Sequence, residues 1–95
     1  MRRAAKVDRN QPEIVKALRQ MGATVLITSQ LKNAFDILVG YRKKLFIVEI
    51  KDGLLPPSAR KLTEGELKCK EKFESVGVKY HVIKSIDEAI DMINQ

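Results

Sequence analysis

Three residues near the middle of the chain could carry out chemistry together: Asp36, Glu49 and Lys51. Along a β-strand every second side chain lies on the same face, so Glu49 and Lys51 would share a face, about 7 Å apart. If the preceding hairpin turn is centred between Arg42 and Lys43, Asp36 lies directly opposite Glu49, with their Cβ atoms about 5 Å apart. The spacing therefore predicts a cluster of two carboxylates and one ammonium group.

Such a cluster is suited to holding a metal ion. Two close carboxylates repel one another unless a cation or a proton lies between them, and burial increases that cost. Hard oxygen ligands select Mg²⁺ or Mn²⁺, and such an ion can polarise a phosphodiester and generate hydroxide from water. Lys51 would orient the attacking water or neutralise charge that develops on the phosphate. Glu13 could reach the same cluster through a water.

The same residues also have a simpler interpretation, in which they form ordinary surface salt bridges. The active-site interpretation is favoured because Glu49 and Lys51 interrupt a strand that is apolar on both faces. It is also favoured because a second carboxylate, Asp36, falls opposite Glu49 by register.

Apolar periodicity and turn residues predict the elements that must position this cluster. Asn10 is expected to cap the first helix, and Thr63 and Ser85 each stand three residues before a glutamate, the spacing of a capping box. The segment 52–62, which contains Asp52-Gly53 and Pro56-Pro57, is predicted to be a loop without regular structure. We expect helices at 11–21, 63–76 and 86–93, and strands at 23–28, 35–40, 45–51 and 78–84.

This order, αβββαβα, indicates an α/β fold with a mixed sheet. Phe46, Val48 and Ile50 alternate with Leu45 and Ile47 in the central strand, so both of its faces are apolar. Helices are therefore expected to cover both faces of the sheet.

Size and composition limit the class of protein. The 95 residues fit a single domain, 1–95, in which 1–8 form a basic arm. A content of 44% hydrophobic residues is sufficient for a core, and a net charge of +6 favours polyanionic partners. A lone cysteine, Cys69, suits a reducing cytosol, and no apolar run is long enough to be a signal peptide or a membrane span. We expect a cytoplasmic protein with no membrane partner.

Further short motifs accompany the cluster, in a fixed order along nearly the whole chain, from about Asp8 to Ile93. They are Arg9-Asn10-Gln11 leading to Glu13, Phe35-Asp36-Ile37-Leu38-Val39-Gly40, Val48-Glu49-Ile50-Lys51-Asp52-Gly53, and Leu62-Thr63. This set resembles the VRR-NUC family of the PD-(D/E)xK nuclease superfamily, whose fold is the restriction-endonuclease-like αβββαβα core.

The resemblance implies roles for individual residues. Asp36 and Glu49 would bind the metal, with the backbone carbonyl of Ile50 as a further ligand. Lys51 would be catalytic, and Glu13 would assist through a water. Stand-alone, phage-type members look like homodimers that cut four-way (Holliday) junctions, so the resemblance implies a structure-specific DNA endonuclease that acts on branched DNA.

The sequence departs from the family pattern at two places. Phe35 stands where the family usually has a proline before the aspartate. Early in the following helix the family tends to have a glutamine, and the candidates here are Glu66 and Leu67. Helical spacing turns Glu66 inward, where it could replace the glutamine or shift the metal preference, so its role stays open.

Basic residues outside the cluster could contact DNA phosphates, although ordinary solvated charge explains each of them equally well. Two rival functions also remain: a nucleic-acid-binding module that keeps the fold without catalysis, and a small interaction protein whose acidic cluster is only a salt bridge. Leu54 and Leu55 could bury in a dimer contact or pack within their own loop. The candidate phosphate contacts are Arg2, Arg3, Lys6, Arg9, Arg42, Lys43, Lys44, Arg60 and Lys61.

Overall fold

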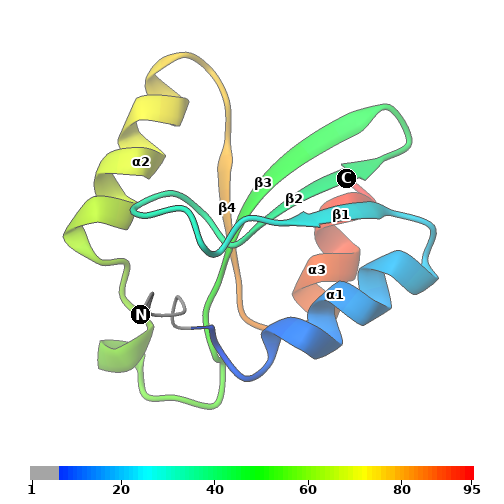
Figure 1. The fold of residues 1–95 in the computed structure, drawn as a ribbon, viewed down its shortest axis with the longest axis horizontal. Helices are drawn as coiled ribbons and strands as arrows, with labels where there is room; N and C mark the ends of the chain where they lie inside the picture. Colours follow the sequence, from blue (N-terminus) through cyan, green and yellow to red (C-terminus); the bar gives the residue numbers. More distant parts are fainter. Residues whose placement is uncertain (1–6) are drawn as a thin grey trace.

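The computed structural model describes residues 7–95, which form a four-stranded sheet and three α-helices (Figure 1). Arg2, Arg3 and Lys6, which the sequence analysis names as candidate phosphate contacts, lie outside the described residues. In chain order the elements are α1 (Gln11–Gln20), β1 (Thr24–Ile27), β2 (Ile37–Tyr41), β3 (Lys44–Ile50), the one-turn 3-10 helix η1 (Pro57–Arg60), α2 (Glu64–Ser75), β4 (Tyr80–Ile83) and α3 (Ile86–Ile93).

The sheet has the strand order β1-β2-β3-β4 and is mixed, as the sequence predicts. The pairs β1/β2 and β2/β3 are antiparallel, whereas β4 lies parallel to β3. The crossover from β3 to β4 contains α2, because parallel neighbours need a long connection. The αβββαβα order is therefore confirmed.

Capping residues fix where α2 and α3 begin. The Thr63 hydroxyl accepts a hydrogen bond from the Glu66 amide, and the Glu66 carboxylate accepts one from the Thr63 amide, which completes the predicted capping box. Ser85 caps α3 through the Glu88 amide, but the Glu88 carboxylate accepts from the Lys84 amide instead of completing the box.

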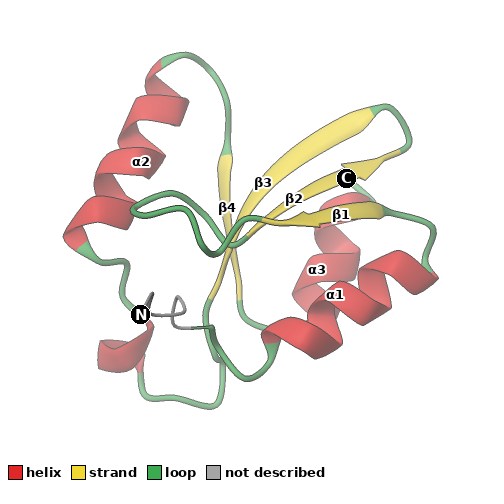
Figure 2. Cartoon of the chain, in the orientation of Figure 1, coloured by secondary structure: helices red, strands yellow, loops and turns green. Residues whose placement is uncertain are grey.

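The hydrophobic core lies between one face of the sheet and the helices α1 and α3 (Figure 2). Ile14 and Leu18 of α1 are fully buried against Ile37, Val39 and the strands beside them. This core layer packs against one face of the β2–β3 hairpin. The residues of the site lie on the other face of the sheet.

The opposite face of the sheet carries α2, so helices lie on both faces as predicted, but this second face is only partly covered. The helix α2 packs against β4 and leaves the hairpin end of this face open. Leu26 and Leu45 are 60% and 71% exposed as a result.

The segment 52–62 is not wholly irregular, which corrects the prediction of a loop without regular structure. Pro57 begins a 3-10 turn, η1, because its fixed φ suits a first helical turn, and Lys61 ends the turn in an extended conformation.

Candidate active site

The β2–β3 hairpin brings Asp36 and Glu49 together. Its turn consists of Arg42 and Lys43, both with positive φ (48° and 68°), as a two-residue hairpin turn requires. The resulting register pairs Ile37 with Val48, as predicted. The ladder ends at this pair: the Asp36 amide donates to the Val48 carbonyl at 2.9 Å, and the Asp36 side chain lines the same cavity as Glu49.

Both carboxyl groups have raised pKa values. The Glu49 side chain is nearly fully buried, and this burial together with the facing Asp36 raises the pKa of Glu49 to about 9. Burial also raises the pKa of Asp36, although the Ile50 amide, which donates to Asp36 Oδ2 at 2.8 Å, opposes the shift. The pair therefore holds a proton at neutral pH unless a cation takes its place.

Lys51 supplies the ammonium group of the cluster. Its Nζ lies 3.5 Å from Glu49 Oε2 and 2.8 Å from Glu66 Oε1, which reaches it from α2. Burial would lower the pKa of Lys51, but the two carboxylates outweigh burial and raise it. For Glu66 the hydrogen bond from Lys51 outweighs burial in the same way and lowers the pKa.

A cavity of about 200 Å³ lies between the sheet and the start of α2. Asp36 and Glu49 line it from the sheet side, and Thr63 and Glu66 line it from the N-cap and first turn of α2. The rest of its lining comes from the segment that joins β1 to β2: Ser29, Leu31, Lys32, Asn33, Ala34 and Phe35.

Tyr80 belongs to the site and was missed by the sequence analysis. It is buried on β4, and its hydroxyl donates to the Ala34 carbonyl at 2.9 Å while lying 3.4 Å from Glu49 Oε1. Burial and the nearby Glu49 raise the pKa of Tyr80, so it remains a hydrogen-bond donor. Only the parallel β3–β4 register, which pairs Glu49 with Val82, puts Tyr80 on this face, and sequence spacing does not give that register.

The side chains of Arg9 and Asn10 bind the segment that follows β3 and do not line the cavity of Asp36 and Glu49. Arg9 forms a 2.6 Å ion pair with the buried carboxylate of Asp52. The Asn10 amide donates to the carbonyls of Lys51 and Lys84, both at 3.0 Å, and makes no side-chain cap for α1, although it stands at the predicted cap position. The two side chains therefore fix the strand end that carries Lys51.

Glu13 is not brought to the cluster. It is exposed and borders a different cavity, together with Asp52 and Lys84. The reason is packing: α1 buries Ile14 and Leu18 against the face of the sheet opposite to Glu49, which turns Glu13 away from the carboxylate pair.

The basic residues within the described part of the chain are spread around the fold. Arg42, Lys43 and Lys44 lie at the hairpin tip, roughly 17 Å from Glu49 at the usual rise of a strand. They therefore do not line the cavity of Asp36 and Glu49. Arg60 and Lys61 lie in the segment that leads into α2, closer to Thr63.

The donor set suits a hard divalent cation. When ionised, Asp36, Glu49 and Glu66 would carry more negative charge than the single ammonium of Lys51 can balance, so a cation would stabilise the ionised cluster. Over residues 7–95, no group of three or more acidic, histidine or cysteine side chains is arranged to hold a metal by itself. A site built on Asp36 and Glu49 would therefore need backbone or solvent oxygens as well.

Comparison with known proteins agrees with this geometry. No protein-family model matches the sequence, and no curated protein matches it. One solved structure, described as a VRR_NUC domain, superposes with a TM-score of 0.68 at 25% identity, and the match covers 97% of this chain and 98% of that one. No helix in residues 7–95 is long and apolar enough to cross a membrane. This match extends over nearly the whole chain, with its mixed sheet and three helices. It thus confirms the resemblance to the VRR-NUC family.

Proposed function

We propose that this chain is a metal-dependent endonuclease that hydrolyses phosphodiester bonds in DNA. The observation that carries the proposal is that the half-buried Asp36 and the buried Glu49 line a single cavity, with the Lys51 ammonium 3.5 Å from Glu49. A carboxylate pair with a raised pKa in a cavity is typical of a functional site and is costly as mere structure. The match to a VRR_NUC domain supports the same class of activity.

Asp36, Glu49 and the Ile50 carbonyl would hold Mg²⁺ or Mn²⁺. When bound, this ion would act as a Lewis acid on the scissile phosphate. The Ile50 amide donates to one oxygen of Asp36, and the buried Glu49 lies between the Tyr80 hydroxyl at 3.4 Å and the Lys51 ammonium at 3.5 Å, so neighbouring groups restrain both carboxylates. Glu13 has no part in the proposal, because it lies on the other side of the sheet.

Lys51 would orient the attacking water and stabilise charge on the phosphate. Its ammonium is held between Glu49 and Glu66, which keeps it protonated at neutral pH. Three N–H donors on one ammonium allow it to keep a carboxylate contact while it donates to a phosphate oxygen. Asn10 supports this role from a distance by holding the Lys51 carbonyl.

Branched DNA is the proposed substrate, and a symmetric dimer is the proposed assembly. The net charge of +6 favours a polyanion, with Arg42, Lys43 and Lys61 as exposed candidate phosphate contacts. The open sheet face, defined by Leu26, Leu38 and Leu45, is an apolar surface that a second copy would cover. Two copies would supply the two sites that paired strand cuts require.

The test compares cleavage of a labelled four-way junction with cleavage of a linear duplex of the same sequence, in Mg²⁺, Mn²⁺ or EDTA. We expect wild type to cut the junction only with metal, and Glu49→Gln to reduce the rate at least about 100-fold. Glu64→Gln, at an exposed carboxylate of α2, is the matched control and should cut normally. Tight junction binding without cutting in either metal would instead favour a non-catalytic binding module.

A further inference from the structure

A second, larger pocket lies on the other side of the segment that joins β1 to β2. Its volume is about 760 Å³, within the range of roughly 300–1,000 Å³ typical of small-molecule sites. Its apolar walls are Val15 and Pro12 from α1 and Ile27 from the end of β1. Ile27 is 52% exposed although its strand neighbours on the same face are buried, so this wall is open to a ligand.

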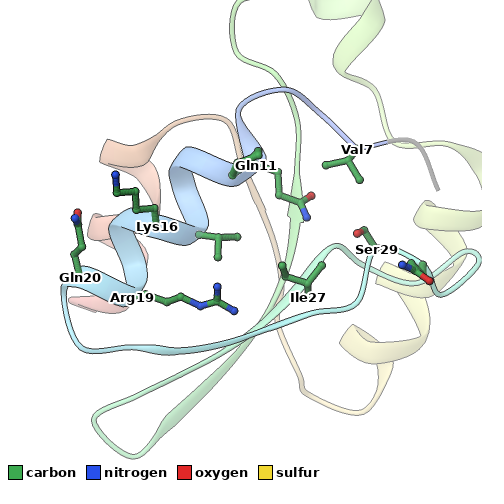
Figure 3. A pocket seen from close by; sticks show the side chains of 10 residues that line it. Val7, Gln11, Lys16, Arg19, Gln20, Ile27 and Ser29 are labelled. Carbon is green, nitrogen blue, oxygen red and sulfur yellow. The ribbon is translucent and has the colours of Figure 1, made fainter. Parts of the chain in front are cut away.

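Gln11 provides the polar group of this pocket. The residue is only 3% exposed, and its amide oxygen has no hydrogen-bond partner among residues 7–95. Figure 3 shows Gln11 and Arg19 reaching from α1 toward Ile27, with Ser29 beyond. A buried carboxamide oxygen without a partner destabilises the protein unless a ligand or an ordered water satisfies it.

The position of the pocket relates it to the cluster of Asp36 and Glu49. Ser29 lines both cavities, and the Thr28 amide donates to the Asp36 carbonyl at 2.8 Å, so the pocket and the catalytic cavity flank one short segment. Arg19, which donates to the Val25 carbonyl at 2.9 Å, places a cation at the far end of the pocket. The pocket thus offers apolar walls, a carboxamide and a cation close to the proposed cleavage site.

We infer that this pocket receives one unpaired nucleobase of the DNA strand that enters the catalytic cavity. The Gln11 carboxamide offers a donor beside an acceptor, which is the pattern that reads a base edge. Val15 and Ile27 pack on the faces of the base, and Arg19 meets a phosphate of the same strand. A base in a duplex is paired and stacked, so the pocket selects DNA that carries an unpaired nucleotide near the cut. This inference rests on the proposed nuclease function.

The test uses the full chain in EDTA, so that binding is separated from cleavage. ¹⁵N-labelled protein is titrated with dAMP, with dTMP and, as a control, with inorganic phosphate. We expect either nucleotide to shift the Gln11 side-chain amide and the Ile27 and Ser29 backbone amides in a saturable way, while phosphate alone leaves the Gln11 amide unmoved. Gln11→Leu should weaken nucleotide binding about tenfold, and Gln95→Leu, the matched control, should not.

Cleavage of junctions with and without an unpaired nucleotide beside the branch completes the test. Gln11→Leu should abolish the preference of wild type for the unpaired nucleotide, and Gln95→Leu should keep it. If wild type cuts DNA but no nucleotide moves the Gln11 amide, the base pocket is wrong and the nuclease stands. If the nucleotides bind through Gln11 but no DNA is cut in either metal, the pocket stands as a nucleotide site and the nuclease is wrong.

Discussion

Lys51 binds Glu66 more closely than it binds Glu49: its Nζ lies 2.8 Å from Glu66 Oε1 and 3.5 Å from Glu49 Oε2. The same Glu66 oxygen accepts the Thr63 amide of the capping box at 2.9 Å. One carboxylate therefore both starts α2 and holds the lysine of the site. Glu66 is one of the two candidates for the position where related sequences tend to have glutamine. Because glutamine has nearly the same shape as glutamate but no charge, Glu66→Gln tests the charge alone.

Glu66→Gln should preserve folding and change the electrostatics of the site. Glutamine can keep the capping box, so the free energy of unfolding should stay within about 0.5 kcal/mol of wild type, whereas Glu66→Ala should lose about 1 kcal/mol or more. The pKa of Glu49 should fall from about 9, because Glu66 raises it through a hydrogen bond and through its charge. Carboxyl ¹³C NMR titration measures the shift, with Glu64→Gln as control. An unchanged Glu49 pKa in Glu66→Gln would contradict the prediction.

The stability of the metal-free protein should fall as pH rises from 6.5 to about 9. The pKa of Glu49 is raised from 4.5 to about 9, so in this range the folded state binds a proton that the unfolded chain has released. The stabilisation is complete below 4.5 and is lost as pH passes through about 9. The pKa values of His81 and Glu66 are lowered, so these groups change stability in the opposite direction, and their effect fades as pH rises above the ordinary histidine pKa of 6.5.

Urea unfolding across that range measures the effect. In Glu49→Gln the decline should be much shallower, because the amide does not titrate. Mn²⁺ in hundredfold excess over its dissociation constant should stabilise wild type by about 2.7 kcal/mol and leave Glu49→Gln unaffected. If the free energy of unfolding declines equally steeply with pH in wild type and in Glu49→Gln, a group other than Glu49 dominates the pH dependence.

Tyr80→Phe should destabilise the protein by about 0.5–1.5 kcal/mol and slow cleavage severalfold. The substitution removes the hydroxyl that donates to the Ala34 carbonyl and lies 3.4 Å from Glu49 Oε1, without opening a cavity. Tyr41→Phe is the matched control, since Tyr41 packs against the core from the end of β2. Urea unfolding and single-turnover cleavage measure the two effects. A Tyr80→Phe protein that cuts at the wild-type rate would remove Tyr80 from the site.

Leu45→Glu should convert the proposed dimer into a monomer. Leu45 is 71% exposed on the open sheet face, where a charge cannot be buried against a second copy. Leu54→Glu is the control: Leu54 is 83% exposed in the loop after β3, away from that face, so its variant should remain dimeric. Sedimentation equilibrium distinguishes the two. Dissociation by Leu54→Glu alone would move the interface to the loop, and a monomeric wild type would refute the dimer.

The sequence by itself determined the order of the elements and the register of the β2–β3 hairpin, which brings Asp36 close to Glu49. Both are local: side-chain alternation sets the faces of a strand, and a two-residue turn at Arg42 and Lys43 fixes the hairpin register. The capping box at Thr63 is local for the same reason.

Only the tertiary structure decided what surrounds that pair. Tyr80 reaches Glu49 through a parallel register that no turn specifies, and Glu66 reaches Lys51 through the packing of α2. Glu13 points away from the site because long-range packing, rather than helical periodicity, chooses the face of the sheet on which α1 lies. Contacts set by local backbone geometry can thus be predicted from spacing, whereas contacts between distant elements depend on how the core packs.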